Sequence, residues 1–231
     1  MNNNPYLAQI YQVLPRLLAM FDQDSTSLSY GMGDRFYWAW GMIDFGNGTM
    51  QGAAHGLSQI WKSGCWPYST KKTEFLRRID NMFYAAGTLT RRNGSLEEAF
   101  PYEGSFCVTS LVAFDLLCSY ELLEEDISDD TCRKWQDIIA PMIEFLLHSD
   151  EKHGIISNHL ATAAAAMLRW NKTVGCSASE IRAKNLLDRI YSHQSKEGWF
   201  QEYDGADPGY QTLCMYYLAD IYSHRPELFN L

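Results

Sequence analysis

The feature that most constrains the fold is a repeat in the hydrophobic pattern. Four segments are apolar or small on nearly every side, and each begins with a polar residue after a glycine-bearing loop. Their starts, which lie 54, 53 and 53 residues apart, are Gln51, Ser105, Asn158 and Gln211. A helix that is apolar all round is buried, and a fixed period near 50 residues is typical of stacked helical units. The repeat therefore predicts four buried inner helices.

The segments between the buried ones are amphipathic and carry charged residues along one side, as in 74–91, 133–148 and 181–194. Such helices face water along one stripe. Helical periodicity dominates the whole chain, and strand signals are few; the stretch 35–45 is left open between a helix and an extended segment. The predicted helices cover 5–22, 50–63, 72–90, 105–123, 130–148, 158–174, 178–195 and 209–224.

One inner and one outer helix in each period make a helical hairpin. We therefore predict an all-α fold, an incomplete (α/α) toroid of about four antiparallel helical hairpins that forms a single domain over residues 1–231. A length of 231 residues with 46% hydrophobic content suits one domain with a large core. If the inner helices run parallel, their N-termini and the loops before them meet at one end, where free N–H groups favour an anion.

The net charge and the cysteines of the chain indicate which binding partners and which cellular environment to expect. The formal charge of −9 disfavours a general phosphate-binding surface, so we predict no nucleic-acid partner. The first 18 residues contain neither an unbroken apolar stretch nor a basic leader, which predicts no signal peptide and no membrane span. Six scattered cysteines without a CxxC motif favour a reduced, cytoplasmic protein. No motif indicates a metal ion or an organic cofactor.

Polar and aromatic side chains gather in the loops that precede the inner helices. Aromatic rings to stack on, beside hydrogen-bonding groups for hydroxyls, are what a saccharide site needs. We therefore predict a saccharide or polysaccharide ligand at this rim. The candidate residues are Arg35, Trp38 and Gln51 in the first loop, Tyr102 and Glu103 in the second, Asn158 and His159 in the third, and Trp199, Glu202, Asp207, Tyr210 and Gln211 in the fourth.

Several candidates keep a structural alternative that the sequence leaves open. Asn158 fits the N-cap of its helix, and Asp207, which precedes a proline, fits a turn. Glu103 fits a position that complements a helix dipole, while His159 and Tyr210 fit packed positions at a helix start.

The remaining histidines are interpreted as structural. His55 lies one turn inside a buried segment and is expected to be packed. His148 and His153 flank a charged turn and are expected to be solvated, and their spacing matches no metal site.

Two motifs carry a family resemblance. The first is the Asn158-His159 pair, which opens a buried segment of small residues. The second follows about 50 residues later and consists of the glycine-bearing stretch 193–202 and the tyrosine of Asp207-Pro208-Gly209-Tyr210. Together they resemble the α/α-toroid domain of heparinase II/III-type and related alginate lyases, over residues 155–221. The β-sandwich that follows the toroid in that family has no counterpart among the predicted elements.

The resemblance implies β-elimination at a uronic-acid residue. Such a lyase neutralises the uronate carboxylate, removes the proton at C5 and protonates the leaving oxygen. By this resemblance Asn158 binds the carboxylate, His159 acts as neutraliser or base, and Tyr210 acts as base or acid. Arg35 is our own candidate for the positive charge beside Tyr210.

Three other functions stay open. A toroid glycoside hydrolase would pair Glu103 with Glu202, Asp204 or Asp207 as general acid and base. A uronate epimerase shares the C5 proton chemistry. A non-catalytic subunit that binds sugar or protein in surface-polysaccharide biosynthesis would use the hairpin array as a scaffold, and both a homo-oligomer and a complex with a partner subunit remain open.

Overall fold

The computed structural model describes residues 4–33, 46–98 and 102–229 and confirms an all-α fold. The α-helices of this part are α1 (Pro5–Ala19), α3 (Ala53–Lys62), α4 (Lys72–Leu89), α5 (Phe106–Leu123), α6 (Asp129–His148), α7 (Ser157–Val174), α8 (Ser177–Ser192) and α9 (Pro208–His224). Short 3₁₀ turns are η1 (Gly48–Gly52), η2 (Glu124–Asp126) and η3 (Pro226–Leu228). Two short strands, β1 (Ile155–Ile156) and β2 (Glu202–Tyr203), pair antiparallel.

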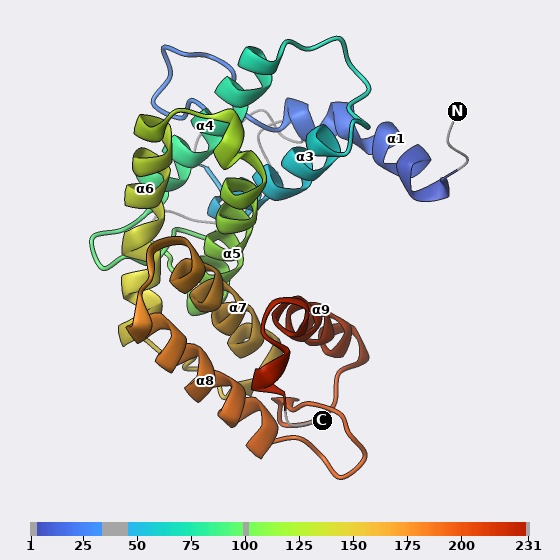
Figure 1. Cartoon of the computed structure of the whole chain (residues 1–231), viewed down its shortest axis with the longest axis vertical. Helices are drawn as coiled ribbons and strands as arrows, with labels where there is room; N and C mark the ends of the chain where they lie inside the picture. The colour runs from blue at the N-terminus through green and yellow to red at the C-terminus, as the bar shows by residue number, and fades with distance from the viewer. Residues whose placement is uncertain (1–3, 34–45, 99–101, 230–231) are drawn as a thin grey trace.

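The helices form two layers that follow an arc. In the inner layer each helix packs against the next, in the order α3, α5, α7 and α9 (Figure 1). The outer layer follows the same rule with α4, α6 and α8. The two layers contact each other where α6 packs on α5 and α8 packs on α7. Helix α1 lies beyond α3 at the N-terminal end of the arc (Figure 1). Its Leu14 side chain is 1% exposed and anchors it to the core.

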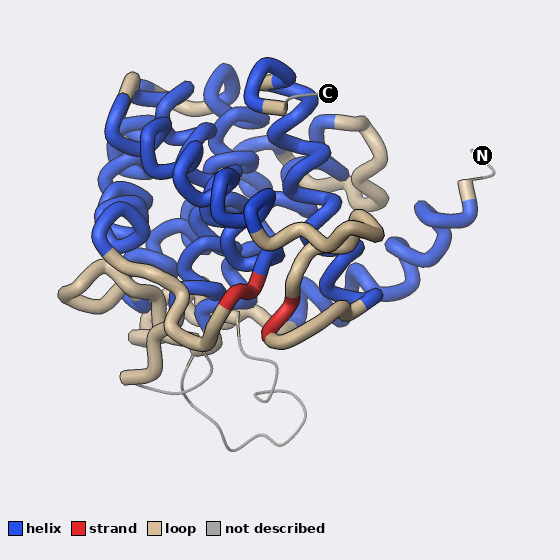
Figure 2. Tube along the Cα trace, turned by 90° about the horizontal axis from the view of Figure 1, so that it is seen from below, coloured by secondary structure: helices blue, strands red, loops and turns tan. Residues whose placement is uncertain are grey.

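The four inner helices run parallel, because residues that touch across each pair advance together along both helices. These pairs are His55–Asp115 and Ser58–Ser119 between α3 and α5, Phe114–Arg169 and Glu121–Lys172 between α5 and α7, and Thr162–Tyr217 and Arg169–Asp220 between α7 and α9. The inner N-termini therefore share one end of the molecule, which we call the rim. Many of the loops and both strands lie along that edge (Figure 2).

Two kinds of packing hold the layers. In α7 each residue of the run Ala161–Ala166 is at most 1% exposed. Such small side chains let the neighbouring helices approach closely. In the outer layer the ring of Phe83 stacks on that of Trp135, with centroids 3.9 Å apart. The indole Nε1 of Trp135 donates to Asp80 at 2.8 Å, so this buried polar atom keeps a partner.

Helix α5 is the most apolar element. The segment Phe106–Asp126 is long and apolar enough to cross a membrane, but most of it is buried inside the fold, against α3, α6 and α7. A core helix has the same composition as a membrane helix when it is covered by protein on every side. The described residues therefore show no clear membrane span.

The predicted helix bounds agree with the observed ones to within a few residues. The inner helices begin at Ala53, Phe106, Ser157 and Pro208, so the observed intervals are 53, 51 and 51 residues. The fourth inner helix was predicted over 209–224 and begins one residue earlier, because Asp207 caps it and Pro208 opens it. The stretch 35–45 lies outside the described residues.

Candidate active site at the rim

The third and fourth loops of the rim are joined by the small sheet. Ile156 in β1 pairs with Glu202 in β2. Next to this pair, the backbone N–H and the hydroxyl of Ser157 both donate to the carbonyl of Gln201, at 3.1 and 2.7 Å. The start of α7 is thereby fixed against the loop that leads into α9.

A buried carboxylate clamps the first turn of α7. Glu202 accepts from the backbone N–H of Asn158 at 2.9 Å and from its side-chain Nδ2 at 2.7 Å. Asn158 is 2% exposed and Glu202 is 3% exposed. Burial raises the pKa of Glu202, and the two hydrogen bonds from Asn158 offset only part of that effect. Glu202 thus replaces the N-cap that the apolar Ile156 cannot supply.

A second buried carboxylate, Glu151, lies between two histidines. It accepts from Nδ1 of His159 at 2.6 Å and from Nδ1 of His153 at 2.8 Å. The backbone N–H groups of Lys152 and His153 add two further bonds. Burial alone would raise the pKa of Glu151, but these bonds outweigh it and the pKa lies below its usual value.

The pairing with Glu151 fixes the chemistry of His159. A carboxylate accepts, so Nδ1 of His159 carries the proton and the lone pair of the neutral ring is on Nε2. The His159 side chain is 14% exposed, whereas that of Glu151 is 3% exposed. A histidine whose Nδ1 bonds to a buried carboxylate, and whose neutral form presents the lone pair of Nε2, has the arrangement of a general base.

Two tyrosines lie next to each other at the same end of the molecule, one in the fourth loop and one at the start of α9. The rings of Tyr203 and Tyr210 are 6.4 Å apart, and 47% and 42% of these residues are exposed. Tyr203 adopts a left-handed backbone with φ 55°. Its pKa is raised by burial first and then by the neighbouring groups, which include Tyr210, Glu151 and Glu202. The fold therefore brings Asn158, His159, Glu202 and Tyr210 to the same end of the molecule.

The glutamines at two inner-helix starts hold loops. Gln51 is fully buried, and its side chain accepts from Gly33 N at 2.8 Å and donates to the carbonyls of Gly31 at 3.1 Å and Met82 at 2.9 Å. Gln211 accepts from the backbone N–H of Phe200 at 2.9 Å. Both side chains are thus engaged by the backbone.

The other predicted residues are spread along the rim. Tyr102 is 84% exposed in a left-handed backbone conformation with φ 69°, and Glu103 beside it is exposed. Trp199 is half-buried and donates through Nε1 to Glu197 at 3.2 Å. Asp207 caps α9 by accepting from Tyr210 N at 2.8 Å. Arg35 and Trp38 lie outside the described residues.

Sequence reasoning missed two carboxylates. Glu151 belongs to a charged turn, and only the fold reveals that it is buried beneath His159. Asp115 lies on α5 and accepts from His55 Nδ1 at 3.0 Å, while Nε2 of His55 bonds to Gln59 at 2.9 Å. Burial raises the pKa of Asp115. A single carboxylate inside an apolar run was the signal that could have pointed to it.

Comparison of the chain with protein-family models, with curated proteins and with solved structures finds no match in any of the three. Among the residues that the structure describes, no group of three or more His, Cys, Asp or Glu side chains could hold a metal ion.

Proposed function

We propose that the rim is the active site of a carbohydrate-active enzyme of the lyase type, which performs β-elimination at a uronic-acid residue with His159 as the base. The observation that carries the proposal is the Glu151–His159 pair, joined at 2.6 Å by Nδ1 at the end where the inner helices begin. The arc of parallel inner helices supports an incomplete α/α toroid, the fold of the lyases that the third and fourth units resemble.

In the proposed reaction, Nε2 of His159 takes the proton from C5 of the uronate. The C4–O bond then breaks as the C4–C5 double bond forms, and the leaving oxygen receives a proton. Glu151 stabilises the imidazolium that results. Tyr210 is assigned as the donor to the leaving oxygen, because it is exposed and lies in the first turn of α9, at the end of the molecule where α7 begins with His159. Exposed rings at Tyr102 and Tyr203 offer stacking surfaces for sugar.

Asn158 has a different role in this proposal from the one that the resemblance implies. Its side-chain nitrogen already donates to Glu202, and it is 2% exposed. We therefore assign it to positioning His159, its neighbour in the chain, and not to the substrate carboxylate. Gln51 is left out of the substrate contacts for the same reason, since it is fully buried.

The lyase hypothesis is favoured over a glycoside hydrolase because two of the carboxylates that a hydrolase would need already accept structural hydrogen bonds. Glu202 uses both oxygens on Asn158, and Asp207 caps α9. A cytoplasmic location is part of the proposal and is supported by six cysteines without a disulfide.

The experiment is an ultraviolet assay for unsaturated uronate on a panel of uronic-acid polymers. We expect a signal from the wild type and a loss of roughly 10²- to 10⁴-fold in His159→Ala and Tyr210→Phe, the usual contribution of a general acid or base. His148→Ala is the matched control, because His148 is exposed and bonds to Glu144 on its own helix. Its activity should equal that of the wild type.

Three outcomes would contradict the proposal. Reducing ends released without ultraviolet absorbance would indicate a glycoside hydrolase. An epimerised product without chain cleavage would indicate a uronate epimerase. Binding of a polymer with no turnover on any substrate of the panel would indicate a non-catalytic subunit.

A further inference from the structure

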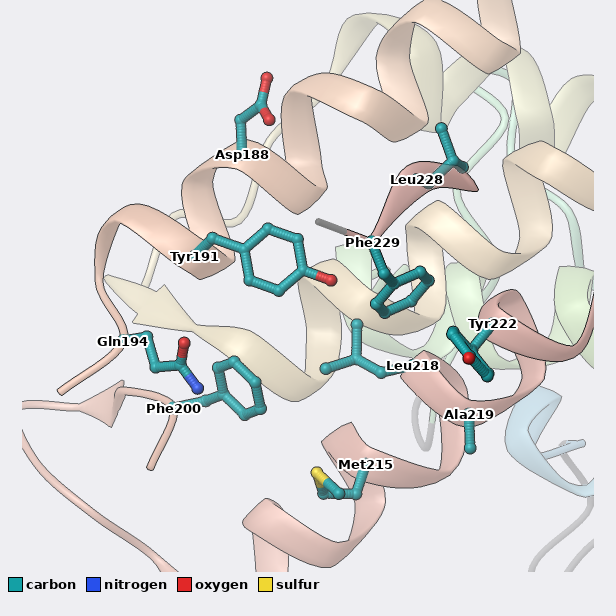
Figure 3. A pocket seen from close by; sticks show the side chains of 10 residues that line it. All are labelled: Asp188, Tyr191, Gln194, Phe200, Met215, Leu218, Ala219, Tyr222, Leu228 and Phe229. Atoms are coloured by element: carbon teal, nitrogen blue, oxygen red, sulfur yellow. The ribbon is translucent and has the colours of Figure 1, made fainter. Parts of the chain in front are cut away.

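Two of the cavities outside the rim differ in the charge of their walls. The larger, of about 690 Å³, lies between α8, α9 and η3, and the one charged group among its labelled side chains is Asp188 (Figure 3). The other, of about 290 Å³, lies between the C-terminal end of α1, the loop before α4 and the first two turns of α4. Among the residues that line it are Trp66, Tyr68, Thr70, Glu74, Arg77 and Arg78. We call it the arginine cavity.

The guanidinium of Arg78 is partly buried and has no carboxylate partner in the described part of the chain. Its hydrogen bond there is a long one, from Nη1 to the carbonyl of Leu18 at 3.5 Å. A guanidinium has five N–H donors, so most of those of Arg78 lack a protein acceptor. Burial lowers the pKa of Arg78, and the neighbouring charge of Arg77 lowers it further.

A buried arginine elsewhere in the fold shows the effect of a counter-charge. Arg169 forms ion pairs with Glu121 at 2.8 Å and with Asp220 at 2.5 Å. Burial acts on its pKa in the same direction as on that of Arg78, but the ion partners outweigh burial and the pKa of Arg169 is raised. A bound anion would give Arg78 the partner that Arg169 already has, and would offset the cost of desolvating its charge.

Two further groups add donors to the arginine cavity. Arg77 is exposed, and its Nη1 donates to the hydroxyl of Tyr30 at 2.6 Å, which leaves its other N–H groups for a ligand. The hydroxyl of Thr70 accepts from Nε1 of Trp66 at 3.0 Å, so its own proton is free to be donated. Donors from two guanidiniums and a hydroxyl suit the three oxygens of a phosphate group better than the two of a carboxylate.

The rest of the wall fits a hydroxylated organic body. Glu74 accepts from the backbone N–H of Lys71 at 3.2 Å, and a carboxylate has further lone pairs that accept from a ligand hydroxyl. Trp66 and Tyr68 supply ring surface, on which the C–H groups of a sugar pack. A volume of about 290 Å³ is more than a phosphate group fills, so it leaves room for such a body.

We propose that the arginine cavity binds a sugar phosphate. The phosphate group lies between Arg77, Arg78 and the Thr70 hydroxyl, and the sugar lies beside Trp66 with a hydroxyl donating to Glu74. The chain as a whole carries a net charge of −9, so two arginines against one glutamate make this cavity a local exception. The site includes none of the predicted rim residues and does not depend on the activity proposed for the rim.

Isothermal titration calorimetry on the full chain tests the ligand class. The probes are glucose 6-phosphate, inorganic phosphate, glucuronate and glucose. We expect one glucose 6-phosphate to bind per chain. Inorganic phosphate lacks the sugar, glucuronate replaces the phosphate by a carboxylate and glucose carries no charge, so each should bind at least about tenfold more weakly.

Two variants locate the bound probe. Arg78→Gln removes a charged donor and should weaken glucose 6-phosphate roughly ten- to hundredfold. Arg77→Glu, at an exposed position, places a negative charge at the cavity and should weaken it at least about tenfold, which keeps the test valid if Arg78→Gln does not fold. Arg92 is also exposed but does not line the cavity, so Arg92→Gln and Arg92→Glu are the matched controls and should leave binding unchanged.

The proposal is overturned if glucose 6-phosphate does not saturate the protein at about 10 mM. Equal affinity for inorganic phosphate would show that the sugar is not recognised, and tighter binding of glucuronate would show that the site prefers a carboxylate; either result also overturns it. Equal weakening by the Arg92 variants and the cavity variants would show a general effect of charge and no site.

Discussion

Replacing Glu202 by alanine tests the link between the third and fourth loops. The change removes the acceptor of two hydrogen bonds, from the backbone N–H and the Nδ2 of Asn158, in a site where both residues are at most 3% exposed. Each stranded donor costs about 1–3 kcal/mol. Relief of the desolvation that raises the pKa of Glu202 returns part of this cost. We expect a net loss of about 2–4 kcal/mol in the free energy of unfolding.

Urea unfolding followed by circular dichroism at pH 7 measures this loss. The midpoint should fall while the slope stays constant, because the folded core is unchanged. Glu202→Gln keeps one acceptor oxygen and should lose about half as much. Glu125→Ala, at an exposed position in η2, is the matched control and should change stability by no more than about 0.5 kcal/mol. If Glu202→Ala and Glu125→Ala unfold at the same urea concentration, the clamp does not stabilise α7.

The sign of the pH dependence gives a second readout of the same clamp. A carboxyl whose pKa is raised on folding binds more protons in the folded state between its ordinary value of 4.5 and the raised value. Stability therefore declines as the pH rises through that window. Glu202→Gln does not titrate and should lack this decline. A wild-type protein whose stability rises over the window by as much as that of the variant would contradict the burial argument.

Three further predictions concern stability. Gln51→Ala removes three hydrogen bonds to the backbone and should lower the free energy of unfolding by about 3 kcal/mol in urea; a loss below about 1 kcal/mol would refute its structural role. Gly94→Ala places a Cβ 2.1 Å from the carbonyl oxygen of Pro141 at φ +85°. It should lower the free energy of unfolding by well over the roughly 1 kcal/mol expected for Gly64→Ala, where φ is +70° and nothing lies within 4 Å. Equal melting temperatures of the two variants would contradict this. Because the pKa of Glu151 is lowered, stability should be lost as the pH falls below 4.5, and Glu151→Gln should reduce that loss in pH-dependent melting; an unchanged acid profile in the variant would count against the pairing with His159.

The sequence was sufficient for the helices and their alternation. Long periodic segments such as 72–89 and 106–123 carry many residues of consistent pattern, so their type and extent are well determined. The spacing of the inner helices also follows from the sequence, because each buried segment is recognised by its apolar and small residues. The predicted start of the last helix, residue 209, was one residue late because a proline start was not recognised.

The roles of individual rim residues did not follow from the sequence. Glu202 and Asn158 are 44 residues apart, and only their pairing in space turns an acidic loop residue into the cap of another helix. Glu151 stands in a charged turn that predicts solvation, yet it is buried under His159. Local pattern cannot distinguish a solvated carboxylate from one that a neighbouring repeat covers.

Bonds that fix the starts of two inner segments, η1 with α3 and α7, reach into the next repeat. Gly48, at the start of η1, donates to the carbonyl of Glu98, and Ser157, at the start of α7, donates to that of Gln201. The first and third hairpins are therefore stabilised by backbone bonds to the repeat that follows each of them. Deleting the last hairpin would fray the one before it, so repeats here could be gained or lost only where the neighbouring loop is replaced as well.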